Sequence, residues 1–170
     1  MSKYFERQLE ELHVQLITLG SYCEKAISFS AKAIQKVQNE EIARQVFETD
    51  RDIDAKEREI ENLCLSLLLH QHPVARDLRE ISAALKMVSD MERIGDQACD
   101  ITGIVKKDAE VLTIRENTHL DKMAKATISM VSKSIQSFIK QNLMIAHEVI
   151  EQDDTVDELF NKVKKETISL

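Results

Sequence analysis

The chain has 170 residues, of which 31% are charged, with 3 glycines, 1 proline and no tryptophan. So few turn-forming residues exclude a fold of many short strands and favour a few long helices, in one compact domain or two small bundles. The formal net charge of −7 argues against nucleic-acid binding, because phosphate contacts need clustered lysine and arginine.

The first two helices follow from the spacing of apolar residues. From Phe5 to Val37 these residues recur at alternating steps of four and three, the seam of a helix that faces partner helices. We expect the first helix to cover about thirty-five residues. Asn39, followed by two glutamates, is a typical N-cap, and the same steps resume after it. A second helix is therefore expected to reach about His70.

The only proline, Pro73, stands where a third helix would begin. The seam of that helix continues to Thr102 and contains one glutamate, Glu92. Residues 108–118 lose the pattern and are the expected linker. A fourth helix is then expected around Met123 to Phe138, and a fifth after Asn142.

The fifth expected helix resembles the second. A shift without gaps aligns seven identical pairs, which run from Asn39 with Asn142 to Asp54 with Asp157 and include Asp50 with Asp153, and this indicates an internal repeat. The sequence thus predicts an all-α fold, a tandem repeat of up-down three-helix bundles at 1–107 and 119–170. The counterpart of Glu92 would fall beyond Leu170, so the second bundle is expected to lack its last helix. We therefore expect dimerisation or helix exchange if the chain ends there.

Acidic residues form two close pairs. Residues four apart on a helix lie on one face, about 6 Å apart along the axis, and Asp50 with Asp54 and Glu92 with Asp96 have this spacing. Neighbouring carboxylates repel unless a cation or proton lies between them, and hard cations prefer oxygen ligands. Three details favour metal over a solvated face: Glu92 lies in the seam, Gly95 removes bulk beside it, and the first pair recurs.

Two alternatives to a metal-binding regulator stay open. Gly95 indicates either close helix packing or the approach of a ligand, and a structural scaffold with solvated acids would suit the first. A ferritin-like di-metal oxidase is the second alternative, because Glu10 with His13 and Glu116 with His119 have its ligand spacing. The latter pair falls at the expected linker, which disfavours it. We predict no enzyme, since the sequence has neither a phosphate-binding loop nor a nucleophile motif.

The cysteines and the apolar runs indicate in which cellular compartment the protein is expected. Cys23, Cys64 and Cys99 are far apart and lie in apolar helical patterns, which indicates reduced core thiols. The densest apolar run, Leu63 to Leu69, is too short to cross a bilayer, and no leader pattern opens the chain. We expect a cytoplasmic protein that meets a membrane only through its partners.

Several stretches resemble a known family. The string from His70 to Arg79, followed by Ala84–Met87 and by Asp90–Asp96, closely resembles the central signature of PhoU-type phosphate regulators. The upstream Asp50–Asp54 segment resembles the partner motif on the preceding helix. The similarity spans nearly the whole chain, except that the second bundle lacks a counterpart of the Glu-Arg-Ile-Gly-Asp helix.

The resemblance implies a fold, a cofactor and partners. It implies paired three-helix bundles that hold multinuclear clusters of iron, zinc or another divalent cation, in a cytoplasmic protein that is not an enzyme. Such proteins restrain phosphate uptake and phosphate-starvation signalling through the phosphate transporter's ATPase subunit and a membrane sensor histidine kinase. The ligands that the resemblance implies are Asp50, Asp54, Glu92, Asp96, Asp153 and Asp157. Arg76 and Arg79 are secondary candidates for an anion or partner contact.

Overall fold

The computed structural model describes residues 3–36, 39–70, 73–107 and 118–168. Within these ranges the chain forms five helices and no strand. The helices are α1 (Lys3–Gln35), α2 (Glu40–His70), α3 (Ala75–Lys107), α4 (Thr118–Lys140) and α5 (Leu143–Ile168). This confirms the predicted all-helical fold. Residues 108–117 of the expected linker lie outside the described residues, and Thr118 is the first residue of α4.

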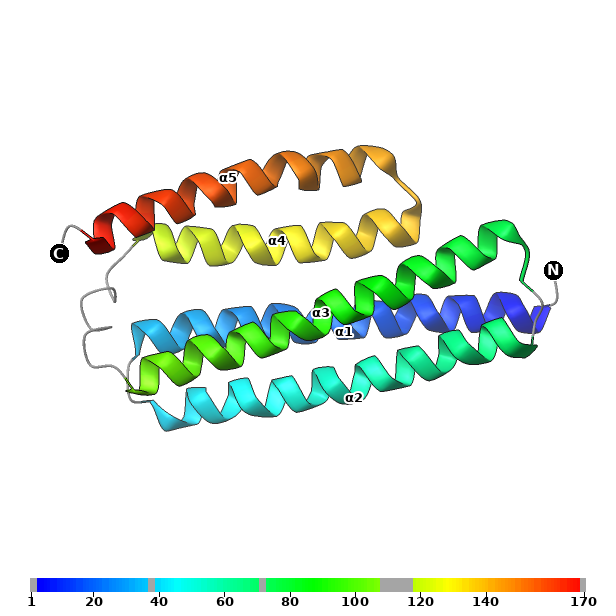
Figure 1. The fold of residues 1–170 in the computed structure, drawn as a ribbon, viewed down its shortest axis with the longest axis horizontal. Helices are drawn as coiled ribbons and strands as arrows, with labels where there is room; N and C mark the ends of the chain where they lie inside the picture. Colours follow the sequence, from blue (N-terminus) through cyan, green and yellow to red (C-terminus); the bar gives the residue numbers. More distant parts are fainter. Residues whose placement is uncertain (1–2, 37–38, 71–72, 108–117, 169–170) are drawn as a thin grey trace.

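The helices are arranged in layers (Figure 1). Helices α1, α2 and α3 contact one another as a three-helix bundle. Helix α4 lies on α1, and α5 lies on α4 at the outer side of the molecule (Figure 1). The two parts of the chain therefore meet mainly through α1 and α4. None of the helices described combines the length and the apolar character that a membrane crossing requires.

In α1 and α2 the core of the three-helix bundle largely follows the predicted seams, whereas in α3 the buried stripe is partly displaced, so that Met91 and not Glu92 is the buried residue at that turn. Leu12, Leu16 and Leu19 of α1 have no exposed surface, and neither do Ile53 of α2 and Ile81 of α3. Each such side chain contributes about 1.5–3 kcal/mol of burial free energy. The seam spacing places these residues on one face of each helix, which explains why the long helices lie side by side.

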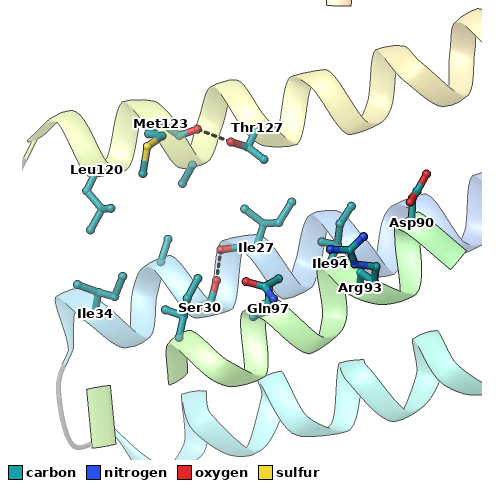
Figure 2. A pocket seen from close by; sticks show the side chains of 14 residues that line it. Ile27, Ser30, Ile34, Asp90, Arg93, Ile94, Gln97, Leu120, Met123 and Thr127 are labelled. Atoms are coloured by element: carbon teal, nitrogen blue, oxygen red, sulfur yellow. Dashed lines mark hydrogen bonds between the residues drawn. The ribbon is translucent and has the colours of Figure 1, made fainter. Parts of the chain in front are cut away.

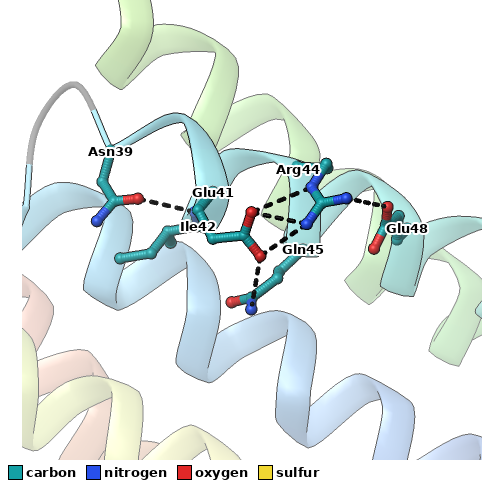
Figure 3. A network of polar contacts seen from close by, with 6 residues as sticks. All are labelled: Asn39, Glu41, Ile42, Arg44, Gln45 and Glu48. Atoms are coloured by element: carbon teal, nitrogen blue, oxygen red, sulfur yellow. Dashed lines mark hydrogen bonds and ion pairs between the residues drawn. The ribbon is translucent and has the colours of Figure 1, made fainter.

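Helix α2 begins at the expected cap (Figure 3). The Asn39 side-chain oxygen accepts a hydrogen bond of 3.1 Å from the backbone N–H of Ile42. One turn further on, Arg44 Nη2 lies 2.7 Å from Glu41 Oε2 and Arg44 Nη1 lies 3.6 Å from Glu48 Oε1. These ion pairs are solvent-exposed and add little stability. The cap is therefore the stronger local reason for the helix start.

The same kind of cap recurs at α5. The Asn142 side-chain oxygen accepts a hydrogen bond of 2.9 Å from the backbone N–H of Met144. At α3 the cap is reversed, because Asp77 Oδ2 accepts a hydrogen bond of 3.3 Å from the N–H of Val74. Asparagine thus caps the two helices that the sequence repeat aligns.

Helix α4 docks on α1 at a glycine. A Cβ atom at Gly20 would collide with Cδ1 of the buried Ile135. Nearer the end of α4, the ring of Phe138 meets the ring of His13 edge-on, with 6.3 Å between ring centroids. The missing side chain at Gly20 therefore lets Ile135 fit against the backbone of α1.

An apolar cavity of about 360 Å³ lies between α1, α3 and α4 (Figure 2). Leu120 and Met123 of α4 face it from one side, and Ile27 and Ile34 of α1 from the other. Arg93 of α3 lies at its edge (Figure 2). The cavity shows that α4 covers the three-helix bundle incompletely.

Candidate metal centre

The predicted acidic pairs lie on adjacent helices. Asp50 and Asp54 are on α2, and Glu92 and Asp96 are on α3, which contacts α2. The first three are half-buried, whereas Asp96 is exposed. Burial disfavours a charged carboxylate that has no partner. Their position between two long helices therefore marks this region as the candidate site.

Gly95 allows the close approach of Asp50. A Cβ atom at Gly95 would lie 2.6 Å from Asp50 Oδ1 and 3.0 Å from Ile53 Cδ1. The close-packing explanation for this glycine therefore applies, since it accommodates the side chains of Asp50 and Ile53, and the approach of a ligand stays a prediction. Asp50 Oδ1 is itself buried without a hydrogen-bond partner among the described residues. A buried carboxylate oxygen in this state has unused capacity to accept a proton or bind a cation.

The carboxyl groups disfavour one another's charge. Burial raises the pKa of Asp50, and the charges of Asp54 and Asp96 raise it further, whereas a hydrogen bond from Cys99 lowers it. Burial also raises the pKa of Glu92, as do the charges of Asp96, Asp54 and Asp50. All four predicted residues thus lie in one electrostatic field. A cation there would relieve both their repulsion and the cost of burial.

Two further groups join this field. Burial raises the pKa of Glu57 on α2, and Glu92 adds to the effect. The sequence contained a signal for it, because Glu57 continues the stepwise spacing of Asp50 and Asp54 along one helix face. Burial and the charge of Asp50 raise the pKa of Cys99 to about 12. Cys99 therefore stays protonated, and its S–H donates a hydrogen bond to the Asp50 side chain, a contact that the sequence did not suggest.

The acids are near one another but do not form a closed ligand shell. Among the described residues, no three side chains of histidine, cysteine, aspartate or glutamate converge closely enough to hold one metal ion. The oxygen donors match what a hard divalent cation takes, and Asp50 has an oxygen to offer. The residues thus fit a metal by chemistry, and closing the shell requires side-chain movement or bound water.

The remaining predicted residues lie elsewhere. Asp153 and Asp157 are exposed on α5, which does not belong to the three-helix bundle. Arg79 is exposed on α3, and Arg76 Nη2 donates a hydrogen bond of 2.6 Å to Gln141 Oε1. The structure therefore brings together four of the six predicted ligands and leaves the α5 pair separate from them.

The histidines of the di-metal alternative have other neighbours. His13 Nε2 lies 2.8 Å from Glu80 Oε1 on α3, whereas Glu10 is exposed. His119 Nδ1 lies 3.1 Å from Glu166 Oε1 on α5. Glu116, the other member of that motif, lies outside the described residues. His13 in the three-helix bundle thus contacts Glu80 and not Glu10, the acid of its sequence motif.

The family model and the most similar relatives that we compared indicate the same protein family. The PhoU domain model matches residues 16–105 and 120–170. A phosphate-specific transport system accessory protein PhoU homolog from Clostridium acetobutylicum is 36% identical over 99% of this chain and 77% of its own length. A homolog of the same description from Aquifex aeolicus is 36% identical over 96% of this chain and 73% of its own length.

Solved structures agree with this result. The crystal structure of PhoU from Pseudomonas aeruginosa superposes with a TM-score of 0.81 at 26% identity, covering 97% of this chain and 79% of that one. The phosphate transport system regulatory protein PhoU from Streptococcus pneumoniae also gives a TM-score of 0.81 at 26% identity, over 98% and 78% of the two chains. Both likenesses extend through all five helices.

Proposed function

Because this chain is a member of the PhoU domain family, we propose that it is a metal-binding regulator that restrains phosphate uptake and phosphate-starvation signalling. The main support for metal binding is the Asp50 Oδ1 atom, which is buried without a hydrogen-bond partner among the described residues and lies beside Gly95, which makes room for it. Its relatives are described as accessory proteins of a phosphate transport system. Regulation by contact, rather than catalysis, is what such an accessory role requires.

The proposed ligands are Asp50, Asp54, Glu92 and Asp96, with Glu57 as an additional one. A divalent cation such as iron or zinc would supply positive charge that holds α2 and α3 together at this point. The role of the protein's own residues is to present oxygen atoms at fixed places on two rigid helices. Asp153 and Asp157 would form part of a second site on α5.

We propose that the partners are the ATPase subunit of a phosphate transporter and a membrane sensor histidine kinase, met in the cytoplasm. Self-association as a homodimer is part of the proposal. Leu143, Met144 and Ile150 of α5 are 67–76% exposed, and exposed aliphatic residues on one helix support an interface. Light scattering of the purified protein tests the dimer, and a monomer at all concentrations would exclude it.

Metal analysis of protein purified without a tag or chelator tests the metal site. We expect a divalent transition metal in the wild-type protein and its loss in the Asp50→Asn/Glu92→Gln variant. The control is Glu6→Gln/Glu10→Gln, which changes two exposed acids of α1 that lie four residues apart, as Asp50 and Asp54 do. If the control loses the metal instead, the di-metal alternative through Glu10 gains support.

Partner binding separates the regulator from the scaffold. The wild-type protein should bind the purified ATPase subunit, and the metal-free variant should bind it more weakly. A variant that loses metal yet binds the ATPase subunit with full affinity would show that the metal is not needed for this contact. If the purified wild-type protein contains no metal and binds the ATPase subunit as well as the variant does, the structural scaffold is the correct description.

A further inference from the structure

Gln141 ends α4 in an unusual backbone conformation. Its φ angle is 49°, and among the described residues it is the only non-glycine residue with positive φ. The N–H of Gln141 donates to the carbonyl of Phe138 at 3.1 Å, and the N–H of Asn142 donates to that of Ser137 at 2.9 Å. This is the hydrogen-bond pattern of a Schellman cap, where glycine is the favoured residue. A glutamine here calls for an explanation from its side chain.

That side chain reaches the three-helix bundle. Gln141 Oε1 accepts a hydrogen bond of 2.6 Å from Arg76 Nη2, and Gln141 Nε2 donates one of 3.3 Å to Glu80 Oε2. Arg76 and Glu80 are one turn apart on α3, so the amide bridges two consecutive turns of that helix. Both polar atoms of the amide are therefore used on the same neighbouring element.

The contact continues into α1. The other oxygen of Glu80 lies 2.8 Å from His13 Nε2, and the Glu80 side chain is only 13% exposed. The His13 ring in turn packs edge-on against Phe138 of α4. The turn after α4 is thus joined to both α3 and α1, in the region where α2 leads into α3. Nearer the start of α4, the apolar cavity lies between α4 and α3.

We infer that Gln141 is a positioning residue that latches the α4–α5 hairpin onto the three-helix bundle through Arg76 and Glu80. Without the latch, α4 would keep its contact with α1 at Gly20 but lose its attachment to α3. The hairpin would then tilt about α1. This assigns to Arg76 a task within the molecule, and it does not depend on metal binding.

Hydrogen exchange of the metal-free 170-residue chain, followed by mass spectrometry, tests the latch. In Gln141→Ala, we expect roughly 3- to 10-fold faster exchange in peptides covering the end of α4 and the start of α5, the range for one or two lost hydrogen bonds. Peptides in the middle of α2 should be unchanged. The matched control is Gln136→Ala, which changes an exposed glutamine of the same helix and should alter neither region.

Gln141→Gly separates the side chain from the backbone. Glycine adopts the left-handed conformation without strain. If Gln141 mattered only as a helix cap, the backbone amides at the end of α4 would therefore exchange more slowly in this variant. The latch predicts faster exchange in the glycine variant as well. Exchange in Gln141→Gly at or below the wild-type rate, or a Gln136→Ala effect as large as that of Gln141→Ala, would overturn the inference.

Arg76 provides an independent test. Arg76→Gln should speed exchange in the same peptides, and adding it to Gln141→Ala should produce no further increase, because one contact can be lost only once. Arg79→Gln changes an exposed arginine of the same helix and serves as the control. Effects of Arg76→Gln and Gln141→Ala that multiply in the double variant would show that the two residues act separately and would refute the latch.

Discussion

The replacement Gly95→Ala tests the geometry at the centre of the candidate site. The added Cβ atom would lie 2.6 Å from Asp50 Oδ1 and 3.0 Å from Ile53 Cδ1. The first distance is too short for any Cβ contact and the second is tight, and Ile53 is fully buried, so a shift of its side chain disturbs the core. Overpacking of this kind costs about 1–3 kcal/mol, whereas alanine gains about 1 kcal/mol over glycine in a helix. We expect a net destabilisation of about 0–2 kcal/mol.

Gly103 supplies the matched control on the same helix. No atom lies within 4 Å of a Cβ placed there, so Gly103→Ala should stabilise the protein by about 1 kcal/mol. Urea unfolding followed by circular dichroism, in the presence of chelator, measures both variants. The free energies of unfolding should differ by about 1–3 kcal/mol, the overpacking cost alone.

Metal binding gives a second measurement on the same pair. Gly95→Ala displaces the Asp50 carboxylate, so its affinity for Mn²⁺ or Zn²⁺ in titration calorimetry should fall by about 10-fold or more. Gly103→Ala should bind like the wild-type protein. If Gly95→Ala is as stable as Gly103→Ala and binds metal equally well, then Asp50 is not held against Gly95 in solution and the reasoning fails.

Other perturbations have equally definite outcomes. The pKa values of Asp50 and Glu92 are raised in the folded protein, so the folded state binds their protons more tightly than the unfolded chain does. This proton binding stabilises the folded state at low pH, and the stabilisation is lost as the pH rises through the folded-state pKa values. Lowering the pH through these folded-state pKa values should therefore stabilise the metal-free protein in urea titrations, less so in Asp50→Asn; an identical slope in the variant would contradict this. Metal at 100 times its Kd should raise the free energy of unfolding by about 2.7 kcal/mol, seen as a higher Tm that chelator reverses; a Tm insensitive to chelator would count against the site. Asn39→Ala should cost about 1 kcal/mol through the lost N-cap; unchanged urea unfolding would show that the cap is dispensable.

The helices were predictable because their signals are local. Asn39 and Asn142 stand directly before two helices, and the apolar seams continue without interruption between such signals. A side chain that caps or packs within its own helix needs no knowledge of the fold. The pairing of Asp50 with Gly95 was suggested only by the residue types, and the contact itself depends on how α2 and α3 align.

What the sequence could not predict depends on residues far apart in the chain. His13 and Glu80 are 67 positions apart, and Arg76 and Gln141 are 65 apart. Neither spacing carries a periodic signal, and the only acid that the local spacing offers to His13 is the nearer Glu10, a match best explained by chance. Cys99 was expected to be a core thiol, yet it is half-buried and hydrogen-bonded to Asp50. Such contacts arise from helix alignment, which periodicity does not fix.

Helix α1 is shared between the two parts of the molecule. On one face it buries Leu12, Leu16 and Leu19 in the three-helix bundle, and on another it receives Ile135 at Gly20. At 33 residues it is about 50 Å long, and a hydrogen-bonded helix resists stretching along its axis. Because α2, α3 and α4 all pack on it, any displacement of α1 would change the contacts of the acidic helices and of the α4–α5 hairpin at the same time.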